Sequence, residues 1–390
     1  MSQAKVFQAS TGLKVTVAVF LLFWLVVAAF PLFWVLVMSF KLPVDAFSAS
    51  PLAVITGPET LAEKGGISIL DMLLGAVAFY LVYQAVSHWT RGVAERVGFG
   101  FTPIGWILGS LIMGAAGLFV FVIILPIVTG AVNWAFGLIP GLSLLAQPVI
   151  GITLDHYIAV WFENEFYRNF LNSMTVTAGV VLISLTVGTL AGYGLARTPS
   201  SLAFWLLIMA LIFRALPHSV LVTGYLPPFI NSREILEPFL GDAAPTLYGQ
   251  PLAVIVVLVS INQPFTIWML RSFFQNIPAE LDEAARVDGC GHFEAFWRVI
   301  MPVMWPGVIT TGLFSFLLAY NDYLVTALLL DAQNQTMVPA ITQYFNRETT
   351  TTDQVEAVAA AVSITAPLFL LVMVFQRQIV SGLTAGAVKG

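Results

Sequence analysis

Long apolar runs separated by short polar segments dominate the chain from end to end. A helix needs about 20 apolar residues to cross the hydrocarbon core of a bilayer. The backbone in lipid must satisfy its own hydrogen bonds, and the runs show too little alternation for barrel strands, so each run is expected to be a helix. Eight segments qualify, namely Val15–Phe40, Ile69–His88, Ile104–Ile127, Asn169–Ala196, Leu202–Tyr225, Leu252–Leu270, Val303–Leu329 and Ala357–Phe375.

Positive charge between the runs predicts their orientation, because loops in the cytoplasm are enriched in Lys and Arg. If the N-terminus is cytoplasmic, the inside segments carry Lys5, Lys14, Arg91, Arg96, Arg197, Arg271, Arg286, Arg298, Arg377 and Lys389. The outside segments then carry only Lys41, Lys64, Arg168, Arg233 and Arg347. The longer polar stretches fall outside, at Lys41–Ser68, Val128–Arg168, Leu226–Pro251 and Asp331–Glu356. Both termini and the charged segment Arg271–Pro302 are therefore predicted to lie in the cytoplasm.

Composition supports an all-α integral membrane protein. Hydrophobic residues make up 58% of the chain and charged residues 9%, and the mean hydropathy is +0.90, whereas about 25% of residues are charged in an ordinary globular protein. The net charge of −5 provides no basic field for nucleic acid. Cys290 is the single cysteine, which excludes an intrachain disulfide and a cysteine-cluster metal site. The first apolar run is too long for a cleavable signal and no cleavage site follows it.

The segment Arg271–Pro302 reads RSFFQNIPAELDEAARVDGCGHFEAFWRVIMP. Pro278 suits the first turn of a helix, and Gly289 suits the position just after its end. A second short helix is expected at about Phe293–Ile300, stopped by Pro302. Periodicity alone is compatible with a solvated loop containing one helical turn. It is also compatible with a helix that sinks a small-sided face into another protein, that face being Leu281, Ala284, Ala285 and Asp288.

The same residues resemble the coupling motif of ABC-importer permeases, E-A-A-x3-G-x9-I-x-L-P. The match runs through Glu283-Ala284-Ala285 and Gly289 to Val299, Ile300, Met301 and Pro302, with Val and Met as mild departures. In that family the two short helices dock into a cleft on the ATPase subunit. The resemblance implies that ATPase coupling rests on Glu283, Ala284, Ala285, Gly289 and Pro302.

Two further stretches are similar to the second permease of maltose-type (alpha-glucoside/maltose-like) sugar importers. The chain ends QRQIVSGLTAGAVKG, which resembles the tail that reaches between the two ATPase subunits in that subfamily. A frayed end is the other reading. The resemblance implies ATPase contacts by Gly382, Leu383, Thr384, Ala385, Gly386 and Lys389. The second stretch is Tyr320-Asn321-Asp322-Tyr323, and Asn172-Ser173 is also similar.

Polar groups within the predicted spans are candidates for the substrate pathway, because charge in a membrane is costly and usually faces a cavity or a partner. Interhelical hydrogen bonding is the alternative for Asn262 and Gln263, and an ion pair with Asp322 is the alternative for Arg214. The pathway residues that we predict are Asn172, Arg214, Asn262, Asn321 and Asp322.

The resemblance covers about His156–Gly390 and the first span. The family core has six spans, so Ile69–Ile127 is expected to be an insertion of two helices into the first external loop. The predicted division is residues 1–41 with the first span, 42–150 with the insertion, and 151–390 as the permease domain, which holds the coupling segment 271–302 and the tail 376–390.

No G-x-x-x-x-G-K-[ST] loop is present, so the chain is not expected to be an ATPase, and no catalytic, metal-binding or cofactor-binding constellation is found. The resemblance implies a permease subunit of an ATP-driven carbohydrate importer in the bacterial cytoplasmic membrane. Its implied partners are a second permease, two ATPase subunits that bind the ATP and an external solute-binding protein. The alternatives are an ion-gradient-driven secondary transporter, an ABC permease for another solute or, with least support, a membrane-bound enzyme.

Overall fold

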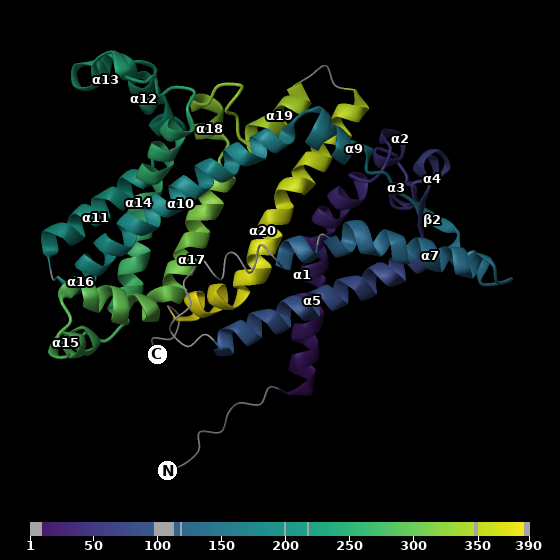
Figure 1. Cartoon of the computed structure of the whole chain (residues 1–390), viewed down its shortest axis with the longest axis horizontal. Coiled ribbons are helices and arrows are strands. Elements are labelled where there is room, and N and C mark those ends of the chain that lie inside the picture. Colours follow the sequence, from purple (N-terminus) through teal and green to yellow (C-terminus); the bar gives the residue numbers. More distant parts are fainter. Residues whose placement is uncertain are drawn as a thin grey trace, which may run out of the picture. The chain divides into compact units, whose positions relative to one another are not determined.

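The computed structural model describes residues 10–96, 113–117, 119–198, 200–216, 218–346 and 350–385, and Figure 1 shows the chain. It consists of helices with one two-stranded sheet in the described part. The chain divides into two compact units. The first unit is Met1–Leu81, Phe119–Val160 and Tyr344–Thr365, and the second is Val82–Leu118, Trp161–Gln343 and Ala366–Gly390.

The first unit begins with α1 (Thr11–Met38), an apolar helix whose side chains are exposed along most of its length. The Ser10 side chain caps its start by accepting a hydrogen bond from the Leu13 amide at 3.3 Å. The predicted span Val15–Phe40 is confirmed to within a turn. The lack of a buried face is what a helix surrounded by lipid requires.

After α1, short elements build a small polar module. These elements are α2 (Pro43–Ala46), α3 (Pro51–Thr56), α4 (Pro58–Lys64), β1 (Gly66–Ser68), β2 (Pro148–Gly151) and α9 (Asp155–Ile158). A proline opens each of α2, α3 and α4, a position where its missing N–H leaves no bond unmade. The predicted loop Lys41–Ser68 is therefore folded.

Lys41 lies at the centre of this module and is 1% exposed. Its ammonium donates to the Gly151 carbonyl, and its own carbonyl lies 3.0 Å from Nε2 of His156. Burial lowers the pKa of Lys41, with Asp45 opposing the shift, and burial also lowers the pKa of His156. Asp45 is occupied locally, since its Oδ2 accepts from the Thr60 amide at 2.6 Å and from the Thr60 hydroxyl at 2.7 Å.

The antiparallel pair β1–β2 joins the two ends of the predicted insertion. Gly66 pairs with Gly151 and Ile67 with Ile150, while the inserted helices lie between the two strands in sequence. A β pair satisfies the backbone groups of both segments where they meet. The insertion therefore begins and ends at one place in the first unit.

Asp71 opens the insertion as a helix cap. The Ser68 amide donates to Oδ2 of Asp71 at 2.7 Å and the Asp71 amide donates to the Ser68 hydroxyl at 3.1 Å, which is a reciprocal capping arrangement. The Asn133 amide group adds a bond to Oδ1 of Asp71 at 2.8 Å. This acid at the start of an apolar helix is thus accounted for by local hydrogen bonds.

The inserted helices differ in extent from the prediction. α5 runs over Ile69–Arg96, so the helix continues past the end of the predicted span Ile69–His88. Much of the predicted span Ile104–Ile127 lies outside the described residues. Its described end passes through a π-helical turn, η1 (Val120–Ile124), into α7 (Leu125–Gly137), well beyond Ile127. α8 (Ser143–Ala146) follows.

The second unit is built on three packed helices, α10 (Phe166–Arg197), α14 (Pro251–Gln275) and α17 (Met301–Tyr320), which lie side by side in Figure 1. Glycines allow the close approach of α10 to α14. A Cβ at Gly188 would lie 2.6 Å from the Thr266 methyl, and one at Gly192 would lie 3.0 Å from the Arg271 amide. Two apolar clusters fill the interfaces, one around Val180 and Leu258 and the other around Phe274 and Phe296.

The remaining elements of the second unit surround these helices. They are the end of η2 (Ala159–Glu163), α11 (Ser201–Arg214), α12 (His218–Ile230), α13 (Ser232–Leu240), η3 (Gly241–Ala243), α15 (Glu280–Val287), α16 (His292–Ala295), η4 (Phe296–Ile300) and α18 (Leu324–Leu329). α19 (Met337–Asn346) and α20 (Thr351–Ala385) contribute residues to both units.

Two predicted spans are wrong in outline. Leu202–Tyr225 is not one helix, since α11 ends at Arg214 and α12 starts at His218; Leu216 precedes a proline in the sequence, which disfavours helical backbone there. Val303–Leu329 is also interrupted, because α17 ends at Tyr320. In the described part of the chain, five helices are long and apolar enough to cross a membrane: Thr11–Met38, Ile69–His88, Phe166–Arg197, Pro251–Gln275 and His292–Tyr320.

The close packing of β2 predicts the effect of a single methyl group. A Cβ at Gly151 would lie 2.3 Å from the Leu61 amide nitrogen and 2.4 Å from the Gly57 carbonyl oxygen, both backbone atoms that cannot rotate away. We expect Gly151→Ala to destabilise the module by about 1–3 kcal/mol, the usual cost of overpacking. The measurement is the temperature at which the detergent-solubilised protein loses its native size-exclusion peak. Gly130→Ala on α7, which meets nothing within 4 Å, is the control, and equal melting of the two variants would contradict the packing.

Candidate functional site

The segment predicted to couple to a partner folds as a short helix with a closed C-terminal turn. α15 carries Glu280, Asp282 and Glu283 in its first turn, where negative charge complements the helix dipole. At the other end the Gly289 amide donates to the Arg286 carbonyl at 3.1 Å and the Cys290 amide donates to the Ala285 carbonyl at 3.0 Å. These two bonds form a Schellman motif. Gly289 has φ of +91°, so its predicted role after the helix end is confirmed.

The face of α15 that is free for a partner differs from the predicted one. Ala285 is only 5% exposed, because α15 packs on α16 and η4 of its own chain. In this structure Ala285 is thus covered by its own chain, and its predicted contact with an ATPase subunit stays a prediction. Glu283 and Ala284 are exposed, and Val287 is 88% exposed. Leu281 and Asp288 of the predicted face are exposed as well. We call Glu283, Ala284 and Val287 the outer face of α15.

A surface hollow lies beside this outer face. Its volume is about 580 Å³ and it is lined by Glu283, Arg286, Val287, Cys290, Gly291 and His292. Charged and apolar side chains thus border a concave surface next to an exposed valine. A partner element could bury Val287 there while meeting charge at the rim.

The second predicted helix is not a separate element. α16, η4 and α17 form one continuous helical path over His292–Tyr320, so Pro302 does not stop the helix. The wide turn η4 comes directly before Pro302, which occupies the start of α17, and such π-turns absorb a local mismatch in the hydrogen-bond ladder. α16 is therefore joined to α17 by helical backbone, with no loop between them.

An ion pair that the sequence analysis missed ties α15 to the helix ends around it. Nε of Arg197, the last residue of α10, lies 2.8 Å from Oδ2 of Asp282, and these side chains are only 20% and 15% exposed. The Tyr193 hydroxyl donates to Oδ1 of Asp282. Spacing alone does not reveal this pair, because the two residues are 85 positions apart.

Arg197 also binds the end of α14. Its Nη1 donates to the Phe274 carbonyl at 3.3 Å and to the Ile277 carbonyl at 3.1 Å. These carbonyls belong to the last turn of α14 and the residues after it, where acceptors lack helical partners. One guanidinium therefore joins α10, α14 and α15. We call Arg197, Asp282 and Tyr193 the helix-end latch.

The predicted tail is partly helical. α20 continues to Ala385, so the backbone of Gly382, Leu383, Thr384 and Ala385 is helical. The alternative reading, a frayed end, required non-helical backbone at these residues. Gly386 and Lys389 lie outside the described residues. Contact of this tail with a partner stays a prediction.

Three residues predicted for a substrate pathway have other contacts in the structure. Asn262 is 1% exposed, and its amide donates to the Ser315 hydroxyl at 2.7 Å, which favours the interhelical alternative. Asn172 donates to the carbonyls of Gln333 and Gln335 at 3.3 and 3.2 Å, so it holds a loop. The Arg214 guanidinium lies 4.7 Å from the centre of the Phe265 ring.

Asn321 and Asp322 mark the break between α17 and α18. Oδ1 of Asp322 accepts from the Thr326 amide at 3.0 Å, and the Asn321 amide donates to the Leu317 carbonyl at 3.2 Å. The Asp322 side chain therefore supplies a hydrogen-bond acceptor for a backbone amide at the start of α18. The ion pair between Arg214 and Asp322 stays a prediction.

Buried polar atoms on α10 and α14 form a set that the sequence analysis did not single out as a group. Thr177 Oγ1, Ser184 Oγ and Gln263 Oε1 are buried without a hydrogen-bond partner among the described residues. A buried polar atom without a partner costs about 1–3 kcal/mol. Nε2 of Gln263 lies 3.4 Å from the Ser184 carbonyl oxygen. The sequence shows Gln263 only as a polar residue within a span, and its sequence neighbours do not predict that it faces Ser184.

A family model and several known proteins are similar to this chain. The family model "Binding-protein-dependent transport system inner membrane component" matches residues 166–384. The trehalose transport system permease protein SugB of Mycobacterium tuberculosis is 31% identical over 240 residues, which cover 61% of this chain and 83% of that protein.

Two further transport permease proteins are similar to this chain. The diacetylchitobiose uptake system permease protein DasC of Streptomyces coelicolor is 32% identical over 61% of this chain and 82% of its own length. The trehalose/maltose transport system permease protein MalG of Thermococcus litoralis is 28% identical over 73% of this chain and 96% of its own length. Among solved structures, a bacterial ABC transporter involved in alginate import matches with a TM-score of 0.47 and 18% identity, covering 71% of this chain and 98% of that one.

The helix-end latch predicts that α15 loosens when Asp282 is removed. Asp282→Ala leaves Arg197 without its carboxylate, which costs ~1–3 kcal/mol for a charged hydrogen bond. We expect amide hydrogen exchange in Glu280–Val287 to become about tenfold or more faster. Asp288→Ala is the matched control, because Asp288 is an exposed acid directly after the same helix. If both variants exchange like the parent, the latch does not hold α15.

Proposed function

Since the chain belongs to the binding-protein-dependent transport system inner membrane component family, we propose that it is the permease subunit of an ATP-driven importer that carries a carbohydrate across the cytoplasmic membrane. The family match over residues 166–384 is the observation that carries this proposal. Trehalose, diacetylchitobiose and maltodextrin occur in the names of its relatives. These names share a carbohydrate class and differ in the individual sugar.

We propose eight spans with both termini in the cytoplasm. The five long apolar helices support this count, together with α11 followed by α12, the inserted helix that ends in α7, and α20. The excess of Lys and Arg in the segments assigned to the inside supports the orientation. The permease core then comprises residues 1–41 and 151–390, with the insertion at 42–150.

The proposed partners are a second permease, two ATPase subunits and the solute-binding protein that the family description names. ATP is held by the ATPase subunits and no cofactor by this chain, which has no sequence loop for phosphate. The binding protein meets the outer ends of the spans, and its contacts include the loops from Val128 onward.

In this proposal the outer face of α15 is the docking element for an ATPase subunit. Glu283, Ala284 and Val287 make the contact, while Ala285 seats α15 on its own chain. Gly289 keeps the turn closed, and Pro302 lies on the continuous path into α17. When the ATPase subunits close on ATP, the helix-end latch carries the motion to α10 and α14.

The tail completes the proposed contact with the ATPase pair. The helical course of α20 to Ala385 supports a rigid approach rather than a loose end. Gly382, Leu383, Thr384, Ala385, Gly386 and Lys389 are the proposed contact residues. Gly and Ala in this stretch leave room for close approach to a neighbouring backbone.

The proposed substrate path uses the polar groups that a sugar requires. Asn321 and Asp322 supply an amide and a carboxylate at the helix break, and Thr177, Ser184 and Gln263 offer buried atoms whose hydrogen bonds are not made within the described chain. Arg214 stays a candidate for the wall of the path. Asn172 and Asn262 are proposed to act indirectly, by holding a loop and a helix pair beside it.

Reconstituted transport tests the function. The chain is produced with the permease, ATPase and binding protein encoded beside its gene, and uptake of labelled trehalose, maltodextrin and diacetylchitobiose into liposomes is measured. We expect uptake of a carbohydrate that requires enclosed ATP and the binding protein and that persists when ionophores collapse ion gradients. Gradient-driven uptake by this chain alone would establish a secondary transporter, and ATP-driven uptake restricted to another solute class would refute the carbohydrate assignment.

The outer face of α15 leads to a second prediction, about ATP hydrolysis. Val287→Asp places a charge where we expect an apolar contact, and because Val287 is 88% exposed the change costs little in the isolated subunit. We expect substrate-stimulated ATP hydrolysis to fall by tenfold or more, while membrane expression stays at the parental level. Val44→Asp, the same change at a valine that is 71% exposed on α2, outside the coupling segment, is expected to retain activity. Normal stimulation in Val287→Asp would show that this face docks nowhere.

A further inference from the structure

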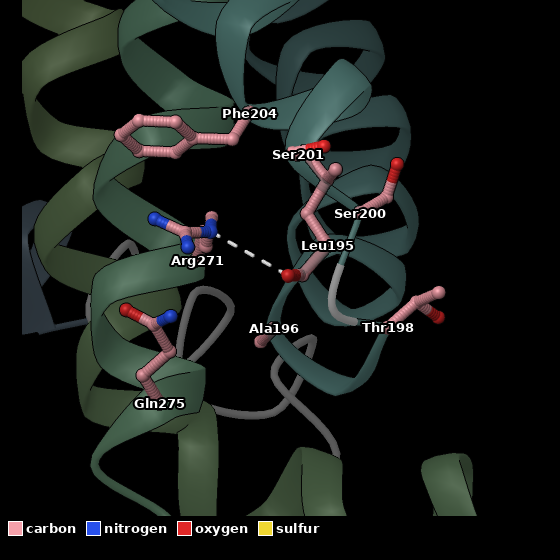
Figure 2. A pocket seen from close by; sticks show the side chains of 8 residues that line it. All are labelled: Leu195, Ala196, Thr198, Ser200, Ser201, Phe204, Arg271 and Gln275. Carbon is pink, nitrogen blue, oxygen red and sulfur yellow. Dashed lines mark hydrogen bonds between the residues drawn. The ribbon is translucent and has the colours of Figure 1, made fainter.

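A second cavity lies between the ends of α10, α11 and α14 (Figure 2). Its volume is about 470 Å³, and its lining includes Thr198, Ser200, Ser201, Phe204, Arg271 and Gln275. None of the described residues that line it is acidic. Under the topology proposed above, on which this inference rests, the cavity opens at the level of the inner-leaflet headgroups.

Arg271 supplies the charge of the cavity. Its guanidinium lies 5.3 Å from the centre of the Phe204 ring, and its Nε lies 3.5 Å from the Leu195 carbonyl. Figure 2 shows it held between these two groups. It forms no ion pair with any residue that the structure describes. A half-buried guanidinium whose orientation is fixed by stacking is suited to bind an anion.

The opposite wall offers further donors. Ser200 caps α11 through a hydrogen bond from the Ala203 amide at 3.2 Å, which places the positive end of this 14-residue helix at the cavity. The hydroxyls of Thr198 and Ser201 and the side-chain amide of Gln275 complete the lining. A positive charge and several donors, without a carboxylate, fit an acceptor-rich anion such as a phosphate group.

Exposed apolar surface continues along α11 from the cavity. Trp205, one helical turn after Ser201, is 63% exposed, and Trp is typical of the interface between headgroups and acyl chains. A free phosphate would gain nothing from this surface, whereas the acyl chains of a lipid would lie along it. The cytoplasmic leaflet is also the anionic one.

We propose that this cavity binds the phosphate of an anionic phospholipid in the inner leaflet. The headgroup phosphate accepts from Arg271 and the hydroxyl wall, and the acyl chains follow the exposed face of α11. The bound lipid would join α10, α11 and α14 close to the residues that form the helix-end latch.

Native mass spectrometry of the assembled transporter tests the site. The complex is supplied with phosphatidylglycerol or with phosphatidylcholine, and the lipid that survives activation is counted. We expect the parent to retain phosphatidylglycerol in preference to phosphatidylcholine. Arg271→Gln should reduce this retention about fivefold or more, the effect of losing one basic group near an anionic surface. Arg168→Gln removes an arginine at the other end of α10 and should leave retention unchanged.

A second variant tests the site without removing any packing. Gln275 lies one helical turn after Arg271 on α14, at i,i+4 spacing, so Gln275→Glu supplies an internal carboxylate that competes for the guanidinium. We expect it to displace the lipid while the complex stays assembled. Asn276→Asp, which adds the same charge beside the cavity but not in its lining, should retain lipid.

Four results would overturn the proposal. They are equal lipid retention in the parent, Arg271→Gln and Gln275→Glu, equal retention of phosphatidylcholine, displacement of lipid by millimolar inorganic phosphate, and retention by the lone chain but not by the complex. The third would assign the cavity to free phosphate and the fourth to a partner protein. The readout does not depend on uptake, so its failure is distinguishable from failure of the transport function.

Discussion

Backbone groups within a membrane have no water to bind, and this constraint explains several places where a described helix of this chain begins, breaks or ends. Ser68 and Asp71 close the first turn of α5 reciprocally. Asp322 supplies the acceptor at the start of α18 where α17 has ended. Arg197 donates to the carbonyls of Phe274 and Ile277 at the end of α14. Some polar side chains that resemble site residues in the sequence therefore form hydrogen bonds with backbone groups at helix ends.

Arg197 connects the end of α14 to α15. The same guanidinium that caps α14 also binds Asp282 on α15, so a displacement of α15 acts on two helix ends at once. Aromatic packing strengthens the joint, since the Tyr193 ring lies 4.8 Å from that of Phe296 and 5.5 Å from that of Phe274 between centroids. Together with the unbroken helical path from α16 into α17, these contacts connect the coupling segment to the packed helices of the second unit.

The first unit shows how a helix pair is added to such a chain without disturbing the flanking segments. Because β1 and β2 pair directly, the inserted residues begin and end at one point. Gly57, Gly66 and Gly151 allow the backbones to approach there, and the Lys41 side chain fills the space beneath them. The module around Lys41 therefore lies where the insertion begins and ends, and its buried ammonium and imidazole are tolerated because each meets a backbone carbonyl.

The sequence by itself determined the class of the protein, most of its helices and the coupling turn. Apolar run length and local spacing are enough for these features, since a span, a cap and a Schellman glycine such as Gly289 depend on neighbours within a few positions. Only the tertiary structure decided that Ala285 faces inward, that Asn262 joins two helices, that Asp282 meets Arg197 and that Arg271 lies in a cavity without an acid. Each of these depends on which helix surfaces meet, and that is set by the packing of segments up to 85 positions apart, about which the periodicity of one segment carries no information.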